Sequence, residues 1–259
     1  MGHPHLKNRL TVITGHYGCG KTNFAINLAL DLAAQAQAAG SAPCGGDLSA
    51  CITLVDLDVV NPYFRSSDYA EMLAARGVRV IAPSFAGTTL DTPVLPADIH
   101  SVFDTEGRVI FDVGGDDVGA TAIGQYASRV EAAGYDMLYV VNRYRNLTST
   151  PQEAADLLGE IEAASHLKAT AIVNNSHLRD QTTVETVLDS IRYAREASEL
   201  LGLPLACTTV PRSLASELSQ RAQSSWAQTP HGPGVPLAAE SAYPIDVYVR
   251  PPWEIDSHG

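Results

Sequence analysis

The chain has 259 residues, a formal net charge of −12 and a hydrophobic content of 45%. This composition allows a large core and excludes an intrinsically disordered chain, while the acidic charge argues against binding to nucleic acid or anionic lipid. With four irregularly spaced cysteines, no apolar leader and no run of roughly 18 apolar residues, the sequence predicts a reduced, cytoplasmic protein without a membrane span.

Apolar runs typical of buried strands alternate with helix-like segments along the chain. The predicted strands are residues 10–15, 51–56, 78–82, 108–113, 136–141, 169–174 and 205–209. The predicted helices are residues 21–39, 67–76, 120–133 and 151–165, a long helix ending near Leu201, and a helix after Pro211. This alternation predicts an α/β fold, a doubly wound and mostly parallel sheet with helices on both faces. Ligands of such sheets bind outside the carboxyl ends of the strands.

The domain organisation follows from the same pattern. Residues 1–223 are predicted to form one nucleotide-binding domain. Residues 224–259 are rich in Pro and Gly and are predicted to form an extended C-terminal arm.

One segment between the first strand and the first helix fits the P-loop pattern G-x-x-x-x-G-K-[ST]. It reads Gly15, His16, Tyr17, Gly18, Cys19, Gly20, Lys21 and Thr22. In such a loop successive backbone N–H groups enclose a phosphate, and the positive end of the following helix adds to the attraction. Lys21 is predicted to contact the β and γ phosphates, and the Thr22 hydroxyl to bind Mg²⁺.

Acidic residues end two further strands and complete this prediction. Asp112 ends the strand RVIF and begins the sequence DVGG, so it is assigned as a magnesium ligand, direct or through water. Asp58 follows the strand CITLV and is assigned to the metal site and to positioning the attacking water. The neighbouring Asp56 is equally consistent with an ordinary turn residue at a strand end.

Together these segments resemble the MinD/ParA/nitrogenase-iron-protein group of P-loop proteins over roughly residues 10–220. The segment VDLD resembles the group's switch I, and DVGGD resembles its switch II. Within the group, the strings GHYGCGKTNFAINLAL and VDLDVVNPYFRS are similar to an uncharacterised CobQ/CobB/MinD/ParA-like subfamily. The resemblance implies that Asn174 contacts the base and that Pro211 and Arg212 cover its edge. It also implies ATP as the nucleotide, Mg²⁺ as its counterion and a homodimer as the assembly.

The chain departs from the group's pattern at two positions. MinD and ParA proteins carry a Lys after the first P-loop glycine, where this chain has His16, so activation across a dimer is in doubt. The DVGG segment also resembles the D-x-x-G of GTPases, so GTP is not excluded. The chain end PPWEIDSHG is unlike the basic amphipathic helix with which MinD-like proteins contact membranes.

Three functions from different classes remain open at this point. The first is an ATPase that acts as a nucleotide-gated switch on a partner protein. The second is an ATP-dependent ligase or kinase for a small carboxylate, suggested by Arg65, Arg143 and Arg145 near the ligand edge of the sheet. The third is a nucleotide-binding module without turnover, suggested by His16.

Overall fold

The computed structural model describes residues 3–39, 51–58, 66–82, 97–115, 117–178, 181–224 and 242–249. Across these residues eight strands form one sheet in the order β3-β2-β4-β1-β5-β6-β7-β8, and every neighbouring pair is parallel. The strands are β1 (Leu10–Thr14), β2 (Ile52–Leu57), β3 (Val78–Ile81), β4 (Arg108–Val113), β5 (Tyr135–Val141), β6 (Ala171–Asn174), β7 (Leu205–Pro211) and β8 (Ala242–Ile245). The predicted α/β architecture is therefore confirmed.

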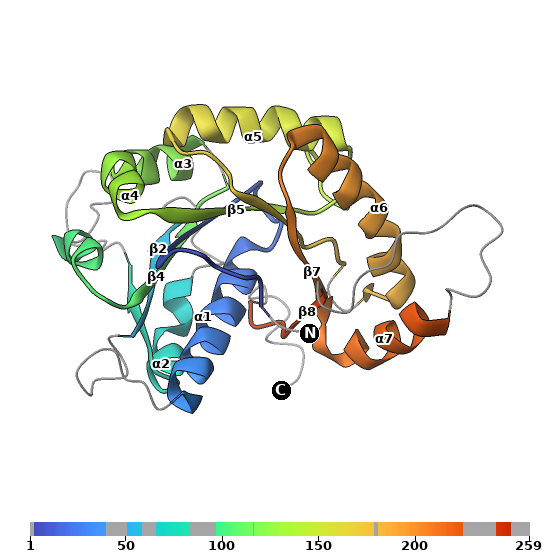
Figure 1. The fold of residues 1–259 in the computed structure, drawn as a ribbon, viewed down its shortest axis with the longest axis horizontal. Coiled ribbons are helices and arrows are strands. Elements are labelled where there is room, and N and C mark those ends of the chain that lie inside the picture. Colours follow the sequence, from blue (N-terminus) through green and yellow to red (C-terminus); the bar gives the residue numbers. More distant parts are fainter. Residues whose placement is uncertain are drawn as a thin grey trace.

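Helices cover both faces of this sheet (Figure 1). They are α1 (Lys21–Ala38), α2 (Ala70–Ala74), α3 (Asp117–Gly124), α4 (Ala127–Ala133), α5 (Pro151–Ser165), α6 (Val184–Leu201) and α7 (Ala215–Ser224). The cluster that contains Phe111, Tyr139 and Leu158 joins the sheet to α3, α4, α5 and α6. A second cluster, which includes Phe24 and Leu73, joins the opposite face to α1 and α2. The central strands are apolar on both sides because both faces are covered.

Helix boundaries follow local signals in the sequence. Thr150 caps α5 in a capping box with Glu153, and Pro151 occupies the first turn, where its missing N–H is no loss. The single helix expected at residues 120–133 is wrong, because α3 ends at Gly124 and α4 begins at Ala127. A β-carbon at Gly124 would lie 2.8 Å from the Ala164 backbone oxygen, so the chain passes directly against the end of α5.

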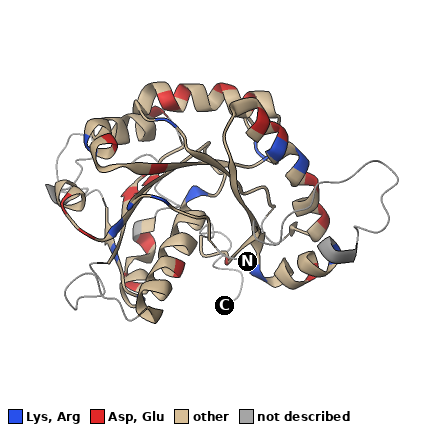
Figure 2. Ribbon diagram, viewed as in Figure 1, with Lys and Arg blue, Asp and Glu red and all other residues tan. Residues whose placement is uncertain are grey.

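Half of the described C-terminal residues 242–249 belong to the sheet, as β8. β8 pairs in parallel with β7, from Thr208 opposite Ala242 to Pro211 opposite Ile245. This portion of the expected arm is therefore an edge strand of the domain, while the boundary at residue 223 stays a prediction. Where the chain is described, its helices are too short or too polar to cross a membrane. Acidic side chains are spread along the outer helices, notably α5 and α6 (Figure 2).

Candidate functional site

The P-loop connects the middle of the sheet to the buried helix α1. β1 ends at Thr14 and α1 begins at Lys21, so residues 15–20 form the turn at the carboxyl edge of the sheet. Gly20 has a φ of +89°, and a β-carbon there would lie 2.3 Å from Asn175 Nδ2. Only glycine satisfies both the left-handed backbone and this close approach. The resulting loop directs a helix N-terminus at the space above it, which suits an anion.

Two polar side chains of the first turn of α1 are held at this loop. Lys21 is 5% exposed, and its Nζ donates a hydrogen bond of 3.1 Å to the His16 backbone oxygen. Thr22 is 8% exposed and, like Lys21, lines the cavity above the loop. The positions expected for a phosphate contact and a magnesium ligand therefore lie side by side.

Asp112 lies at the bottom of the same site, at the end of β4. It is fully buried, and neither oxygen of its carboxylate has a hydrogen-bond partner among the described residues. Burial, followed by the charge of Asp56 opposite it in register on β2, raises the pKa of Asp112 to about 8. Lys21 and Thr22 lower this pKa, although the Thr22 hydroxyl does not meet the geometry of a hydrogen bond to Asp112. A buried carboxylate without donors is suited to a cation that is not part of the chain.

The two other acids differ in position. Asp58 is 7% exposed and lines the cavity, as expected for a residue that positions water or metal. Asp56 is fully buried, and its Oδ1 accepts a hydrogen bond of 3.0 Å from the Asp58 backbone N–H. Asp56 therefore shapes the strand end that carries Asp58.

The loop after β4 packs directly on the P-loop. A β-carbon at Gly115 would lie 2.4 Å from the Tyr17 backbone nitrogen and 2.7 Å from Lys21 Nζ. The Gly115 backbone therefore lies next to the amine that is expected to hold the terminal phosphate. A ligand at Lys21 has to contact this loop or displace it.

The cavity above the P-loop has a volume of about 280 Å³. The P-loop and the first turn of α1 line it together with Asp58. Further lining comes from residues that follow β5 and β6 and from the C-terminal segment, namely Asn142, Arg145, Asn175, His177, Val247 and Val249. Within the described part of the chain, no group of three or more His, Cys, Asp or Glu residues forms a metal site alone. Mg²⁺ bound mainly by phosphates and one or two protein oxygens fits this observation.

Asn175 joins the P-loop to β7 and to the segment after β6. Its Nδ2 donates to the Cys19 backbone oxygen at 2.7 Å, and its Oδ1 accepts from Thr209 Oγ1 at 2.5 Å. The Nε2 of His177 lies 2.8 Å from the same Oδ1. Burial, with a smaller effect of the Arg145 charge, lowers the pKa of His177 to about 4, so this ring is neutral near pH 7 and donates to Asn175.

Arg145 carries a positive charge at the cavity, close to the P-loop. Its Nε would lie 3.9 Å from a β-carbon at Gly18. This Nε is buried and has no hydrogen-bond partner in the part of the chain that the structure describes. Its neighbour Arg143 is already engaged, because Nη1 donates to the Asp189 backbone oxygen at 2.7 Å. Arg65 lies outside the described residues.

Some residues expected at the site do not reach the cavity. Asn174 is fully buried, and its Nδ2 donates to Ser190 Oγ at 2.9 Å, whereas the next residue, Asn175, lines the cavity. Pro211 does not line the cavity, and Arg212 forms an ion pair with Asp246. Contacts of Asn174, Pro211 and Arg212 with a base therefore stay predictions without geometric support.

His16 does not supply the cation that the group's Lys would provide. Burial, the largest effect, and the Lys21 charge lower the pKa of His16, which favours a neutral ring. Its Nδ1 is buried without a hydrogen-bond partner among the residues described. Without a bound anion, His16 is therefore no substitute for the group's Lys.

No family model and no curated protein matches this chain. Solved structures similar to it include the cell division protein FtsY from Thermotoga maritima, at 18% identity and a TM-score of 0.49 over 81% of this chain. The signal recognition particle receptor FtsY from Elizabethkingia anophelis matches at 18% identity and a TM-score of 0.45 over 80% of this chain, and its complex with GDP at 19% and 0.45 over 79%. The chain spans 64%, 60% and 57% of these structures. At this level of likeness, nothing about ligands is transferred.

Proposed function

We propose that this chain binds the magnesium complex of a nucleoside triphosphate and acts as an ATPase that switches a partner protein. The observation that carries this proposal is the P-loop at the centre of the sheet with the orphaned carboxylate of Asp112 beneath it. The loop supplies backbone N–H groups and the charge of Lys21 to the phosphates. The proposed setting is the cytoplasm.

The residues present fit a magnesium ion. The Thr22 hydroxyl and the Asp112 carboxylate would hold it, and Asp58 lies in the same cavity as a further oxygen ligand. When bound, Mg²⁺ neutralises phosphate charge and holds the phosphates in a fixed geometry. Asp58 would also accept a hydrogen bond from the attacking water and orient it.

The contact of the β4 loop with the P-loop supports a switch. Gly115 lies against Tyr17 and Lys21, so a terminal phosphate at Lys21 and the position of this loop depend on one another. Loss of that phosphate would change the loop and the surface it presents to a partner. We expect slow turnover by the isolated chain, because His16 provides no permanent positive charge.

ATP is proposed over GTP on the resemblance of the sequence to the MinD/ParA group. The two amides that line the cavity do not select a base, because both are engaged within the protein. Asn142 donates to the His177 backbone oxygen at 3.3 Å and accepts from the Tyr144 N–H at 3.0 Å. Asn175 donates to the Cys19 backbone oxygen and accepts from Thr209 Oγ1.

A ligase or kinase for a small carboxylate is the second candidate. The observation in its favour is Arg145, a guanidinium at the cavity whose Nε has no partner in the described chain. In that case the arginine would bind the carboxylate substrate, and ATP turnover would be negligible until the substrate is added. In the switch, Arg145 would contact a phosphate instead.

Calorimetric titration with ATP, GTP and ADP, each with and without Mg²⁺, tests the proposal. We expect binding of Mg-ATP by the native chain and a loss of at least about 100-fold in Lys21→Ala, because a charge-assisted phosphate contact is removed. Lys168→Ala is the matched control, because this lysine is exposed and, among the described residues, its ion pair is with Glu162. Equal binding of ATP by the Lys21 and Lys168 variants would remove the P-loop assignment.

Light scattering tests the switch. A mass that increases with a non-hydrolysable ATP analogue but not with Mg-ADP supports a nucleotide-dependent homodimer. A constant mass, together with ATP turnover that appears only after a carboxylate is added, supports the ligase or kinase instead.

A further inference from the structure

The C-terminal segment Asp246–Val249, which follows β8, forms part of the cavity wall. Val247 and Val249 line the same cavity as Lys21 and Thr22, although more than 200 residues separate them in the chain. Both valines are half-buried without a ligand, so part of their apolar surface faces the open space.

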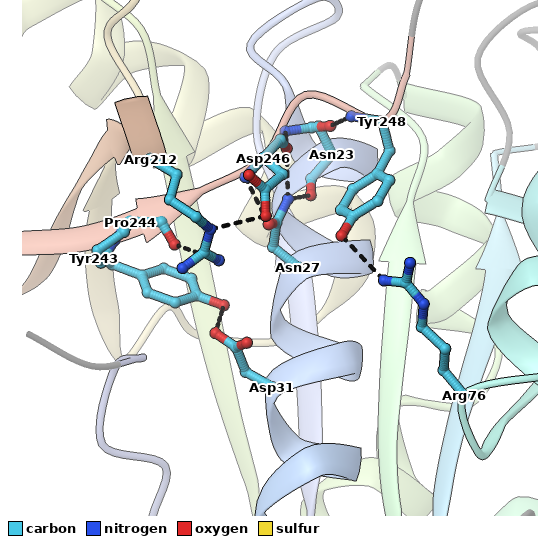
Figure 3. A network of polar contacts seen from close by, with 9 residues as sticks. All are labelled: Asn23, Asn27, Asp31, Arg76, Arg212, Tyr243, Pro244, Asp246 and Tyr248. Carbon is cyan, nitrogen blue, oxygen red and sulfur yellow. Dashed lines mark hydrogen bonds and ion pairs between the residues drawn. The ribbon is translucent and has the colours of Figure 1, made fainter. Parts of the chain in front are cut away.

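Two asparagines of α1 hold this segment through its backbone (Figure 3). Asn23 Nδ2 donates to the Asp246 oxygen at 2.9 Å, and its Oδ1 accepts from the N–H groups of Tyr248 at 2.8 Å and Val249 at 3.3 Å. Asn27 accepts from the Asp246 N–H at 2.8 Å and donates to its backbone oxygen at 2.9 Å. The two side chains therefore pair backbone N–H and C=O groups of this segment, as a neighbouring strand would.

Side-chain contacts fix the start of this segment and the strand β8 before it. Arg212 Nε donates to Asp246 Oδ2 at 2.8 Å, and the Tyr243 hydroxyl donates to Asp31 Oδ2 at 2.8 Å (Figure 3). Tyr243 is buried against α1, with its ring edge-on to Phe24 at a centroid distance of 6.0 Å. The valines are therefore presented to the cavity from a fixed backbone.

We propose that Val247 and Val249 form the apolar wall that contacts the nucleoside part of the nucleotide. The proposal deepens the proposed function and rests on it. Aliphatic side chains offer nothing to a phosphate, and the P-loop, which lines the same cavity, supplies the phosphate contacts. A purine or ribose face buries apolar surface against the valines.

α1 thereby serves both ends of the ligand. Its first residues, Lys21 and Thr22, face the phosphates, and the next residue, Asn23, holds the nucleoside wall. Asn27 does not line the cavity, so it acts on the ligand only through the segment and is a positioning residue.

The test compares two probes, Mg-ATP and Mg-tripolyphosphate, on the full chain by calorimetry. Val247→Ala and Val249→Ala each remove part of the wall, so each is expected to weaken Mg-ATP about 5-fold, and the double variant roughly 20-fold. Mg-tripolyphosphate, which has no nucleoside, should bind all variants as it binds the native chain. Leu200→Ala, an exposed aliphatic residue on α6, should change neither affinity.

Asn27→Ala provides an independent variant that leaves the cavity surface intact. It should weaken Mg-ATP several-fold and leave Mg-tripolyphosphate unchanged, because only the wall loses its support. Val247→Thr and Val249→Thr keep the side-chain shape, and they give the same comparison if an alanine variant fails to fold in a thermal melt.

The outcomes separate the two proposals. If the native chain binds neither probe, the proposed function fails, and this inference fails with it. The other case is that the native chain binds both Mg-ATP and Mg-tripolyphosphate. If the valine variants then leave both affinities unchanged, or reduce both equally, the function stands and the nucleoside wall is refuted.

Discussion

Replacing Asp112 with asparagine should stabilise the nucleotide-free protein at alkaline pH. The pKa of this buried carboxyl is raised from 3.8 to about 8, so the folded state binds its proton more tightly than the unfolded chain does. Folding stability from this group is therefore fully present below pH 4 and is lost as the pH rises towards 8. The cause is burial first and the neighbouring charge of Asp56 second.

The size of the effect follows from the pKa difference. One pKa unit corresponds to about 1.4 kcal/mol, so the buried Asp112 lowers the free energy of unfolding, relative to acid pH, by at most about 5 kcal/mol at pH 8 and about 2 kcal/mol at pH 5. An asparagine amide buried at the same place has its own cost, but that cost does not depend on pH. The stability of the Asp112→Asn variant relative to the native chain should therefore increase by about 3 kcal/mol from pH 5 to pH 8.

Urea unfolding at both pH values, with EDTA and without nucleotide, measures this difference. The same variant should lose the magnesium-dependent part of ATP binding, because an amide is a weaker ligand than a carboxylate for this ion. A stability difference that is equal at pH 5 and pH 8 would refute the raised pKa. A variant that is more stable at pH 8 and still binds Mg-ATP as tightly as the native chain would refute the metal assignment alone.

Other predictions concern the loop and the charge beside it. Gly20→Ala should lower the melting temperature and impair ATP binding, because its backbone is left-handed and a β-carbon there would lie 2.3 Å from Asn175 Nδ2. Gly159→Ala should stabilise the protein by about 0.5–1 kcal/mol, because this residue lies in a helix with open space around it. Thermal melts of the two variants check both signs. Arg145→Ala should weaken the affinity for Mg-ATP several-fold, because Arg145 lines the cavity. Arg143→Ala should leave this affinity unchanged, because the Arg143 guanidinium contacts a backbone oxygen outside the cavity. Equal effects of the two variants in calorimetry would remove Arg145 from the phosphate site.

The sequence alone predicted the architecture and the position of the P-loop turn. Continuous apolar strands alternating with helices indicated a parallel sheet, and the P-loop pattern located the turn after β1. Because the carboxyl ends of parallel strands share one edge, the sequence also predicted that Asp58 and Asp112 lie at the same edge as Lys21. These features depend on residue type and spacing within short segments, which a single sequence contains.

The rest of the cavity lining depended on contacts between distant segments. Which of Asn174 and Asn175 faces the cavity is decided by the side-chain alternation at the end of β6 and by the partners Ser190 and Cys19. The sequence showed that successive side chains of a strand alternate between its two faces. It did not show which face each residue takes, because that depends on how the strand pairs with its neighbours.

The C-terminal segment shows the limit most clearly. Nothing in residues 242–249 indicates a ligand, and the Pro- and Gly-rich surroundings predicted an arm outside the domain. Its place in the cavity wall follows from pairing of β8 with β7 and from the hydrogen bonds of Asn23 and Asn27, which are more than 200 residues away in sequence. The sequence by itself therefore determined the fold and the place of the P-loop turn, because both are encoded in local patterns. Only the tertiary structure decided the other wall of the cavity, because long-range pairing of the backbone places it there.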